Sequence, residues 1–145
     1  MDHPHPLSVE ELTRLLGEHF PQSFGAGAFY IEECGLMHAR LRMPYKDFYL
    51  RPGGTISGPA MFTLADVSLY VAILATIGWV PLAVTTNLTI NFVSKPQPAD
   101  MLADCRLIKL GKALAVGEVH MRSEGSQTIV AQASGTYSIP PAPRK

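Results

Sequence analysis

One acidic residue lies inside an otherwise apolar stretch of the sequence. Around Asp66, from Met61 to Tyr70, every other side chain is apolar or carries only a hydroxyl group. An acid in such surroundings must be paired, protonated or chemically useful, because burying an unpaired charge is costly. Asp66 is therefore a candidate general base or nucleophile in a hydrophobic site. The alternative is a structural carboxylate that bonds a backbone amide or an arginine at a subunit contact.

A second candidate precedes this stretch. The segment T-I-S-G-P at residues 55–59 is a turn that leads into a predicted helix. Free amides and the helix dipole at such a start favour a developing oxyanion, and Gly58 would supply the accessible amide. Alternatively, Ser57 or Gly58 only caps the helix. We do not expect Ser57 to be a nucleophile, because the segment is not G-x-S-x-G and no histidine is near in sequence.

The spacing of these two candidates constrains how they could cooperate. Gly58 and Asp66 are eight positions apart, which is roughly 12 Å along a helix axis. One chain cannot easily aim both groups at a single carbonyl. If they act together, Gly58 of one subunit must face Asp66 of another across a two-fold axis. Dimerisation is then a condition of activity.

Metal and nucleoside-triphosphate sites are not indicated. The basic turn from Lys109 to Lys112 could hold phosphates as point charges, but it lacks the glycine-rich pattern of a P-loop. The histidines form neither an H-x-x-x-H nor a Cys/His pattern, and those on predicted strands are expected to be exposed or structural. The five histidines are His3, His5, His19, His38 and His120.

Composition narrows the class of protein. The chain has 145 residues, which is typical of one domain and predicts a single domain over residues 1–145. It carries 12 basic and 12 acidic side chains without a run of like charges, so a nucleic-acid partner is not expected. Charged residues make up 17% of the chain, below the usual figure of about 25%. Part of the surface is therefore expected to be buried by association.

The predicted compartment is the cytoplasm. The N-terminus has neither the basic start nor the apolar stretch of a signal peptide. Cys34 and Cys105 lie far apart in sequence, which suits a reduced protein better than a disulfide scaffold. The apolar run over residues 60–80 is long enough to raise the question of a membrane span, but the charge of Asp66 in its middle argues against one. We therefore expect no membrane partner.

Capping and breaker residues place two helices. Ser8 and Glu11 form a capping box, and leucines at helical spacing follow until Pro21. This pattern predicts a short helix within an N-terminal extension, residues 1–24. Pro59 suits the first turn of a second helix that is apolar almost all round, so we expect a buried central helix over residues 59–77.

Alternating stretches predict a sheet. A hairpin split at Gly35 and four later strands give one sheet of about six strands around the central helix, an α+β fold. The predicted strand regions are 28–43 for the hairpin, then 83–93, 101–110, 113–122 and 128–139. In the first long strand, one face is expected to hold Val84, Leu88, Ile90 and Phe92, and the other Thr85, Asn87, Thr89 and Asn91.

These residues resemble the hotdog-fold acyl-CoA thioesterases of the phenylacetate-degradation (PaaI) type, over about residues 30–139. That family typically shows an Asn or Gln, then H-G-G opening a long helix, an L-x-D or L-x-E within it, a strand close to V-T-V-D-L-N-I-N-F, and a basic turn. The corresponding places are Arg51, S-G-P at 57–59, L-A-D at 64–66, V-T-T-N-L-T-I-N-F at 84–92, and 109–112.

The resemblance implies a single hotdog domain and specific roles. Asp66 would be the base or nucleophile, the Gly58 amide of the neighbouring subunit the oxyanion donor, and Thr85 the hydroxyl that helps to place water. Lys109 and Lys112 would hold the nucleotide of coenzyme A, which enters only as part of the substrate, with no other cofactor. Dimers pairing edge to edge, and then back to back into a homotetramer, are what the family implies.

Three positions depart from the family pattern. Ser57 replaces the histidine, Pro59 replaces the second glycine, and Arg51 occupies the place of the Asn or Gln. One hypothesis is that Arg51 reaches Asp66 of the partner subunit and lowers its basicity. Alternatively, Arg51 binds an acidic acyl tail or a phosphate of coenzyme A, since its planar fork suits both.

Three functions remain in competition at this point. The leading hypothesis is hydrolysis of a small aromatic or short- to medium-chain acyl-CoA. The second is a catalytically degenerate hotdog protein that binds acyl-CoA without turnover, because the S-G-P segment is altered. The third is a dehydratase or hydratase, which is disfavoured because that chemistry usually pairs a histidine with an acid and the helix and its preceding loop lack a histidine.

Overall fold

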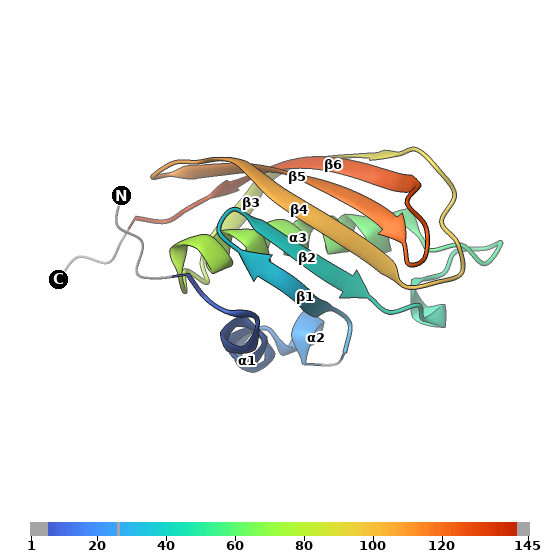
Figure 1. Cartoon of the computed structure of the whole chain (residues 1–145), viewed down its shortest axis with the longest axis horizontal. Helices are drawn as coiled ribbons and strands as arrows, with labels where there is room; N and C mark the ends of the chain where they lie inside the picture. Colours follow the sequence, from blue (N-terminus) through green and yellow to red (C-terminus); the bar gives the residue numbers. More distant parts are fainter. Residues whose placement is uncertain (1–5, 26, 142–145) are drawn as a thin grey trace.

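The computed structural model describes residues 6–25 and 27–141, and it shows one antiparallel sheet wrapped around one long helix (Figure 1). The six strands lie in the order β1-β2-β4-β5-β6-β3. This confirms the predicted α+β class. The helices are α1 (Val9–His19), α2 (Pro21–Phe24) and α3 (Gly58–Ile77), with a 3-10 turn at Asp47–Tyr49. The strands are β1 (Tyr30–Gly35), β2 (His38–Met43), β3 (Val84–Phe92), β4 (Met101–Leu110), β5 (Leu114–Ser123) and β6 (Ile129–Ser138).

The long helix α3 begins and ends close to the predicted positions. Ser57 caps it, because its Oγ accepts a hydrogen bond from the Ala60 amide at 3.3 Å. Pro59 lies in the first turn, where a missing amide proton costs nothing. At the other end Gly78 has φ 94°, a conformation that favours glycine, and its amide donates to the Leu74 carbonyl at 3.0 Å.

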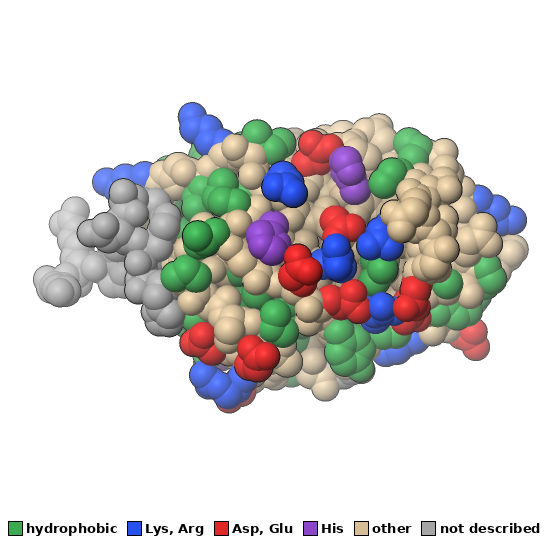
Figure 2. All heavy atoms as spheres, viewed as in Figure 1, with side chains coloured by type: hydrophobic (Ala, Val, Ile, Leu, Met, Phe, Trp, Pro, Cys, Tyr) green, Lys and Arg blue, Asp and Glu red, His purple; other side chains and the backbone are tan. Residues whose placement is uncertain are grey.

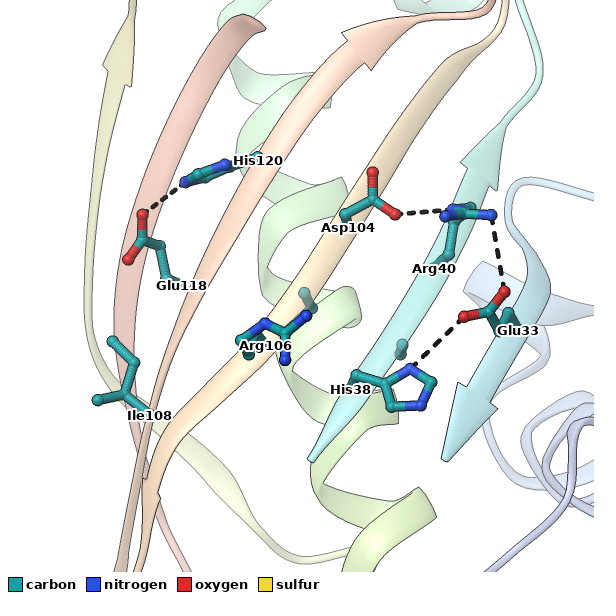
Figure 3. A pocket seen from close by; sticks show the side chains of 10 residues that line it. Glu33, His38, Arg40, Asp104, Arg106, Ile108, Glu118 and His120 are labelled. Carbon is teal, nitrogen blue, oxygen red and sulfur yellow. Dashed lines mark hydrogen bonds and ion pairs between the residues drawn. The ribbon is translucent and has the colours of Figure 1, made fainter. Parts of the chain in front are cut away.

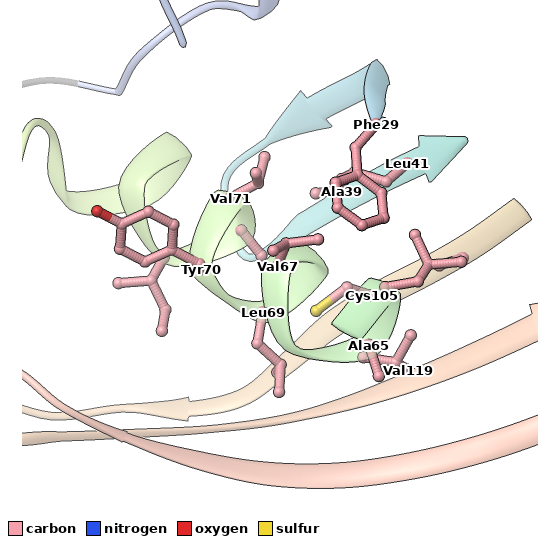
Figure 4. Close-up of a cluster of buried hydrophobic side chains, with 14 of the residues drawn as sticks. Phe29, Ala39, Leu41, Ala65, Val67, Leu69, Tyr70, Val71, Cys105 and Val119 are labelled. Carbon is pink, nitrogen blue, oxygen red and sulfur yellow. The ribbon is translucent and has the colours of Figure 1, made fainter. Parts of the chain in front are cut away.

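Two facing glycines let α3 lie close to the sheet. Gly117 and Gly135 pair across β5 and β6. A Cβ atom at either position would lie 2.5 Å from a terminal methyl of Leu69, a side chain that is 1% exposed. Figure 4 shows Leu69 among the buried side chains of α3, which pack with strand residues such as Leu41 and Val119. The glycine pair therefore provides the space that the helix fills.

Helix α3 is long and apolar enough to cross a membrane by length and composition alone, but in this fold it is the buried core helix. Of its most apolar 18-residue window, 78% is buried inside the protein. The sheet therefore supplies the apolar surroundings that this helix needs.

The N-terminal helix has the predicted cap. The Ser8 Oγ accepts from the Glu11 amide, and the Glu11 carboxylate accepts from the Ser8 amide, which completes the capping box. Leu12 and Leu16 are fully buried, so α1 covers part of the core. Pro21 does more than close this helix, because it also lies in the first turn of the short helix α2.

The turn between β1 and β2 lies later than expected. The sequence pattern placed Leu36 on the second strand, but β2 begins at His38 and the turn is formed by Leu36 and Met37. Met37 has φ 67°, and tertiary contacts hold it there. Its amide donates to Thr76 Oγ1 at 2.8 Å and its carbonyl accepts from the Leu107 amide at 2.8 Å. Those contacts come from distant residues and could not be seen in the local pattern.

A bulge in β3 changes which side chains face the helix. Thr85 pairs with Tyr137 and Asn87 with Thr136, so Thr86 is an extra residue. The predicted grouping of Val84 with Leu88 and Ile90 is therefore wrong. Val84 is 57% exposed, and Thr85 instead turns toward α3. The bulge thereby brings a hydroxyl to the one acid of the helix.

Candidate active site

Asp66 opens onto a groove of about 530 Å³ beside α3. One wall consists of α3 with the ends of β3 and β6, and the other of α1, α2 and the loop after α3. Most of the lining is apolar, and four of its side chains are Phe20, Tyr70, Trp79 and Tyr137. Phe62, which is also on α3, is instead 41% exposed on the surface.

Two hydroxyl groups hold one oxygen of Asp66. Thr85 Oγ1 donates to Asp66 Oδ1 at 2.5 Å, and the Tyr137 hydroxyl lies 2.8 Å from the same atom. The Tyr137 hydroxyl also lies 2.9 Å from the Asp66 carbonyl, so its single proton is shared between two acceptors of one residue. Among the described residues, Asp66 Oδ2 has no hydrogen-bond or ion-pair partner. The side chain is therefore fixed in orientation and has one oxygen free for chemistry.

Tyr137 is suited to this role by its burial. The residue is 4% exposed, and this burial, with the nearby charge of Asp66, raises the pKa of the Tyr137 hydroxyl well above its usual range. The hydroxyl therefore stays protonated and remains a donor. Sequence reasoning missed Tyr137, because an inward-facing position on a β-strand gives no sign of which helix residue it meets.

The first turn of α3 leaves one backbone amide free. Ser57 Oγ occupies the Ala60 amide, Pro59 has no amide proton, and the Met61 amide donates to the Ser57 carbonyl. The Gly58 amide has no acceptor among the described residues. A Cβ at Gly58 would lie 3.3 Å from the Phe92 ring, so glycine also relieves crowding there. The predicted capping role of Ser57 is confirmed, and Gly58 keeps a donor for another molecule.

Within one chain the groove contains Asp66 and Thr85 but neither Ser57 nor Arg51. Ser57 and Pro59 line a neighbouring groove of about 340 Å³ at the start of α3, which shares Ser23 and Thr63 with the Asp66 groove. Arg51 is exposed in the preceding loop, and its backbone amide donates to the Thr55 carbonyl at 2.9 Å. Among the described residues its side chain has no ion pair. The pairing of Arg51 with a partner's Asp66 stays a prediction.

The basic turn lies at the same end of the sheet as the groove. Thr85 pairs with Tyr137, Tyr137 with Ala115, and Ala115 with Leu110, so one cross-strand row joins β3 to the end of β4. Lys109 and Lys112, both exposed, flank the last residue of that row. Three strand spacings separate this row's ends, roughly 14 Å.

A third groove, of about 510 Å³, lies on the outer face of the sheet, away from α3. Figure 2 shows charged and histidine side chains gathered on this face, and Figure 3 shows that most of them are paired. Arg40 bonds Asp104 at 2.7 Å and lies 3.7 Å from Glu33, and His120 lies 2.5 Å from Glu118. The expectation that the strand histidines are exposed or structural thus agrees with the structure for His120. His3 and His5 lie outside the described residues.

Neither the outer face nor the groove offers a metal centre. Within residues 6–25 and 27–141, no group of three or more His, Cys, Asp or Glu side chains could hold a metal ion. The thiols are also poor nucleophiles, because burial raises the pKa of Cys105 to about 12 and raises that of Cys34 as well. Of the groups in the described chain, Asp66 has the environment of a reactive group.

Comparison with known proteins gives the family. The model of the thioesterase superfamily matches residues 53–130, more than half of the chain, including Gly58, Asp66 and Thr85. A candidate thioesterase from Silicibacter sp. is 44% identical, with 97% of this chain and 96% of that chain covered, and its structure superposes with a TM-score of 0.86. A protein from Saccharolobus solfataricus named as a candidate esterase is 27% identical over 92% of this chain and 86% of its own length.

The fold agrees with a more distant structure as well. A variant of the phenylacetic acid degradation protein PaaI from Thermus thermophilus is 21% identical, with 83% of this chain and 99% of that chain covered and a TM-score of 0.71. The six-stranded sheet around a central helix, the family match and these likenesses agree. The chain belongs to the thioesterase superfamily and has the hotdog fold.

Proposed function

We propose that this protein is an acyl-CoA thioesterase in which Asp66 performs the chemistry. The observation that carries the proposal is the state of its carboxylate. Two hydroxyl groups fix Oδ1, while Oδ2 has no partner among the described residues, and Asp66 lines an apolar groove. The free carboxylate oxygen can take a proton from water or attack a carbonyl carbon.

Two routes use the same geometry. In the first, Asp66 Oδ2 attacks the thioester carbon, the C–S bond breaks, coenzyme A leaves as the thiolate, and water then hydrolyses the mixed anhydride. In the second, Asp66 takes a proton from water as the water attacks the same carbon, after which the C–S bond breaks and coenzyme A leaves as the thiol with that proton. In both routes the carbonyl oxygen gains negative charge, which the free Gly58 amide of a partner subunit would stabilise. Thr85 holds the carboxylate and lies where it can help to place water.

The proposed site needs two copies of the chain. Strand β3 is at the edge of the sheet, so one side of its backbone has no neighbouring strand. Apolar side chains accompany this edge, with Val84 57% exposed and Phe92 53% exposed. Pairing of two such edges would remove them from water and bring Gly58 of one chain toward Asp66 of the other. We propose a homodimer as the smallest active unit and a homotetramer as its dimer of dimers.

The proposed substrate is a small aromatic or short- to medium-chain acyl-CoA. Lys109 and Lys112 are exposed at the sheet end that holds the groove, where they can meet the phosphates of the nucleotide. The cytoplasmic location and the absence of any cofactor other than substrate-borne coenzyme A stay predictions.

The shared site can be tested by complementation. Gly58→Pro removes the amide while a proline is tolerated at the start of a helix, and Gly58→Ala adds a similar Cβ but keeps the amide. We expect thiol release from acyl-CoA to be lost in Gly58→Pro and in Asp66→Asn, and retained in Gly58→Ala. Mixed dimers of the two inactive chains, purified through two different tags, should recover about half of the wild-type activity because one of their two sites is intact.

Each result bears on a different part of the proposal. Mixed dimers no more active than their parents would contradict the shared site. A wild-type protein that releases no thiol from any aromatic or aliphatic acyl-CoA would contradict the thioesterase function itself.

One observation favours the alternative of a binding protein without turnover. Ser57, in the family's histidine position, accepts from the Ala60 amide through its Oγ, and Pro59 offers no second amide. Among the described residues, the start of α3 therefore offers the Gly58 amide as its free backbone donor, and a serine hydroxyl stands where the family has a histidine. Thermal stabilisation by acyl-CoA without thiol release would support this alternative.

A further inference from the structure

We propose that the Asp66 groove accepts acyl groups that carry no polar substituent, and that it disfavours hydroxylated or carboxylated ones. This inference rests on the thioesterase function proposed above and names the substrate class of that site. It follows from how the polar atoms of the groove are already used.

The groove gives a direction to the acyl group. With the thioester carbon at Asp66, the next turn of α3 presents Tyr70, roughly 6 Å further along the helix axis. Beyond Tyr70 the lining continues with Trp79, Pro81 and Leu82. An acyl group of phenyl size or longer therefore passes Tyr70 and points toward these residues.

The hydroxyl groups along this path are engaged within the protein. The Tyr70 hydroxyl donates to the Pro81 carbonyl at 2.8 Å, and the Tyr137 hydroxyl is shared between two oxygens of Asp66. On the other side of Asp66, one turn earlier in α3, Thr63 Oγ1 donates to the Pro59 carbonyl at 3.0 Å. The protons of these hydroxyl groups are therefore not offered to a substituent on the acyl group.

Ring packing holds the tyrosines in this arrangement. The Tyr70 ring is stacked on Tyr137, with centroids 6.1 Å apart and planes at 24°, and Phe20 meets Tyr70 edge-on at 6.4 Å. Tyr70 is 9% exposed, so it has little freedom to turn its hydroxyl toward a ligand. The acyl group consequently meets carbon atoms of rings along this wall.

The opposite wall contains two polar side chains, His19 and Ser23, from α1 and α2. The His19 ring packs against Trp79 with centroids 5.4 Å apart, and it is exposed. These two residues are the positions that could reverse the preference, and they are therefore part of the test.

A polar substituent that enters the groove loses water and finds no free hydroxyl proton along the Tyr70 and Tyr137 wall. Burying an unpaired hydroxyl is unfavourable, and an apolar pocket rejects an added hydroxyl by up to about 100-fold. We therefore expect kcat/KM for phenylacetyl-CoA to exceed that for its para-hydroxy derivative by about 10- to 100-fold. The same order is expected for hexanoyl-CoA over its ω-hydroxy analogue.

A matched pair of tyrosine variants sharpens this test. Tyr70→Phe frees the Pro81 carbonyl, which can then accept from a substrate hydroxyl, so the preference should narrow several-fold. Tyr45→Phe removes a hydroxyl that bonds the Gly54 carbonyl outside the groove, and it should leave the preference unchanged. Equal preference in the two variants would argue against a role for the Tyr70 to Pro81 bond.

Binding separates this inference from the proposed function. Affinities of the wild-type protein for CoA thioethers that carry the same apolar and hydroxylated groups can be measured by calorimetry, and they do not depend on turnover. Tighter binding of the apolar thioethers supports the inference even if no thioester is hydrolysed. Equal or tighter binding of the hydroxylated thioethers overturns it, and loss of that binding in His19→Leu or Ser23→Ala would show which residue is responsible.

Discussion

The two larger grooves of the described chain have nearly the same volume but differ in how their acidic side chains are paired. The outer groove, about 510 Å³, contains carboxylates paired with cations, such as Asp104 with Arg40 at 2.7 Å. The inner groove, about 530 Å³, contains Asp66, which is held by hydroxyl groups. A cation beside a carboxylate forms an ion pair that occupies its oxygens, whereas two hydroxyl donors on Oδ1 of Asp66 orient the group and leave Oδ2 without a partner among the described residues. The partners of an acid, more than the size of its groove, therefore decide whether it can react.

The difference arises from the two faces of one sheet. On the outer face, register alone sets Glu33, Arg40, Asp104 and His120 side by side across β1, β2, β4 and β5. Alternating charges in such a row satisfy one another in water. The inner face is covered by α3. Asp66 on this helix is therefore surrounded by apolar residues and is bonded by side chains of the neighbouring strands.

The largest expected effect comes from replacing an aspartate by asparagine in the inner groove, compared with the same replacement in the outer groove. Asp66→Asn should lower kcat by about 1000-fold or more, because it removes the base or nucleophile. Asp104→Asn, the matched change on the outer face, should alter kcat by less than about twofold. Thiol release measured at equal oligomeric state compares them, and a similar loss in both variants would break the distinction between the grooves.

A smaller effect is expected from the hydroxyl groups that hold Asp66. Tyr137→Phe and Thr85→Val should each lower kcat by about 10-fold, since each removes a hydrogen bond to a charged group. KM should change little, because these hydroxyls do not bind the acyl group. Thr85→Ser keeps the hydroxyl and should retain most of the activity. If Thr85→Val and Thr85→Ser are equally impaired, packing rather than the hydrogen bond explains the loss.

The smallest expected effect concerns the dependence of folding stability on pH. This dependence has opposite signs for Tyr137 in the inner groove and for Asp100 on the outer face. The pKa of Tyr137 is raised from 10.0 by burial, so its contribution is complete below pH 10 and is lost as the unfolded chain ionises above it. The pKa of Asp100, beside Arg42 on the outer face, is lowered from 3.8, chiefly by the Tyr45 amide. Its contribution is present above that pH and is lost on acidification.

Urea unfolding at acidic, neutral and alkaline pH measures both contributions. Above about pH 10 the wild type should lose about 1 kcal/mol per pH unit more than Tyr137→Phe does. Below about pH 4 it should lose more than Asp100→Asn does, by less than about 1 kcal/mol, since this ion pair is partly exposed. Parallel pH profiles for wild type and Tyr137→Phe would contradict the assignment to Tyr137.

Local patterns located most elements of the fold. The capping box at Ser8, the proline in the first turn of α3 and the glycine at its end act within a few residues, so the sequence alone located α1 and α3. The short helix α2 was not predicted. Alternation located the strands to within two residues at most ends. The acid at Asp66 was conspicuous because its neighbours in sequence are apolar.

Non-local contacts determined the features of the site that local patterns did not predict. The bulge at Thr86 depends on the pairing of β3 with β6, and it alone turns Thr85 rather than Val84 toward the helix. The position of the groove wall from α1 and α2 also depends on non-local packing, and this wall lies outside residues 53–130, which the family model matches.

By itself, then, the sequence determined that an acid would lie on a buried helix within a sheet, because helix period, caps and strand alternation are properties of adjacent residues. Only the tertiary structure decided that Asp66 would be held by two hydroxyls, Thr85 and Tyr137, and by no cation of residues 6–25 and 27–141. Tyr137 lies 71 positions from Asp66 in the chain. Which donors reach a buried acid depends on strand register and on how closely α3 approaches the sheet, and both are set by packing between distant segments.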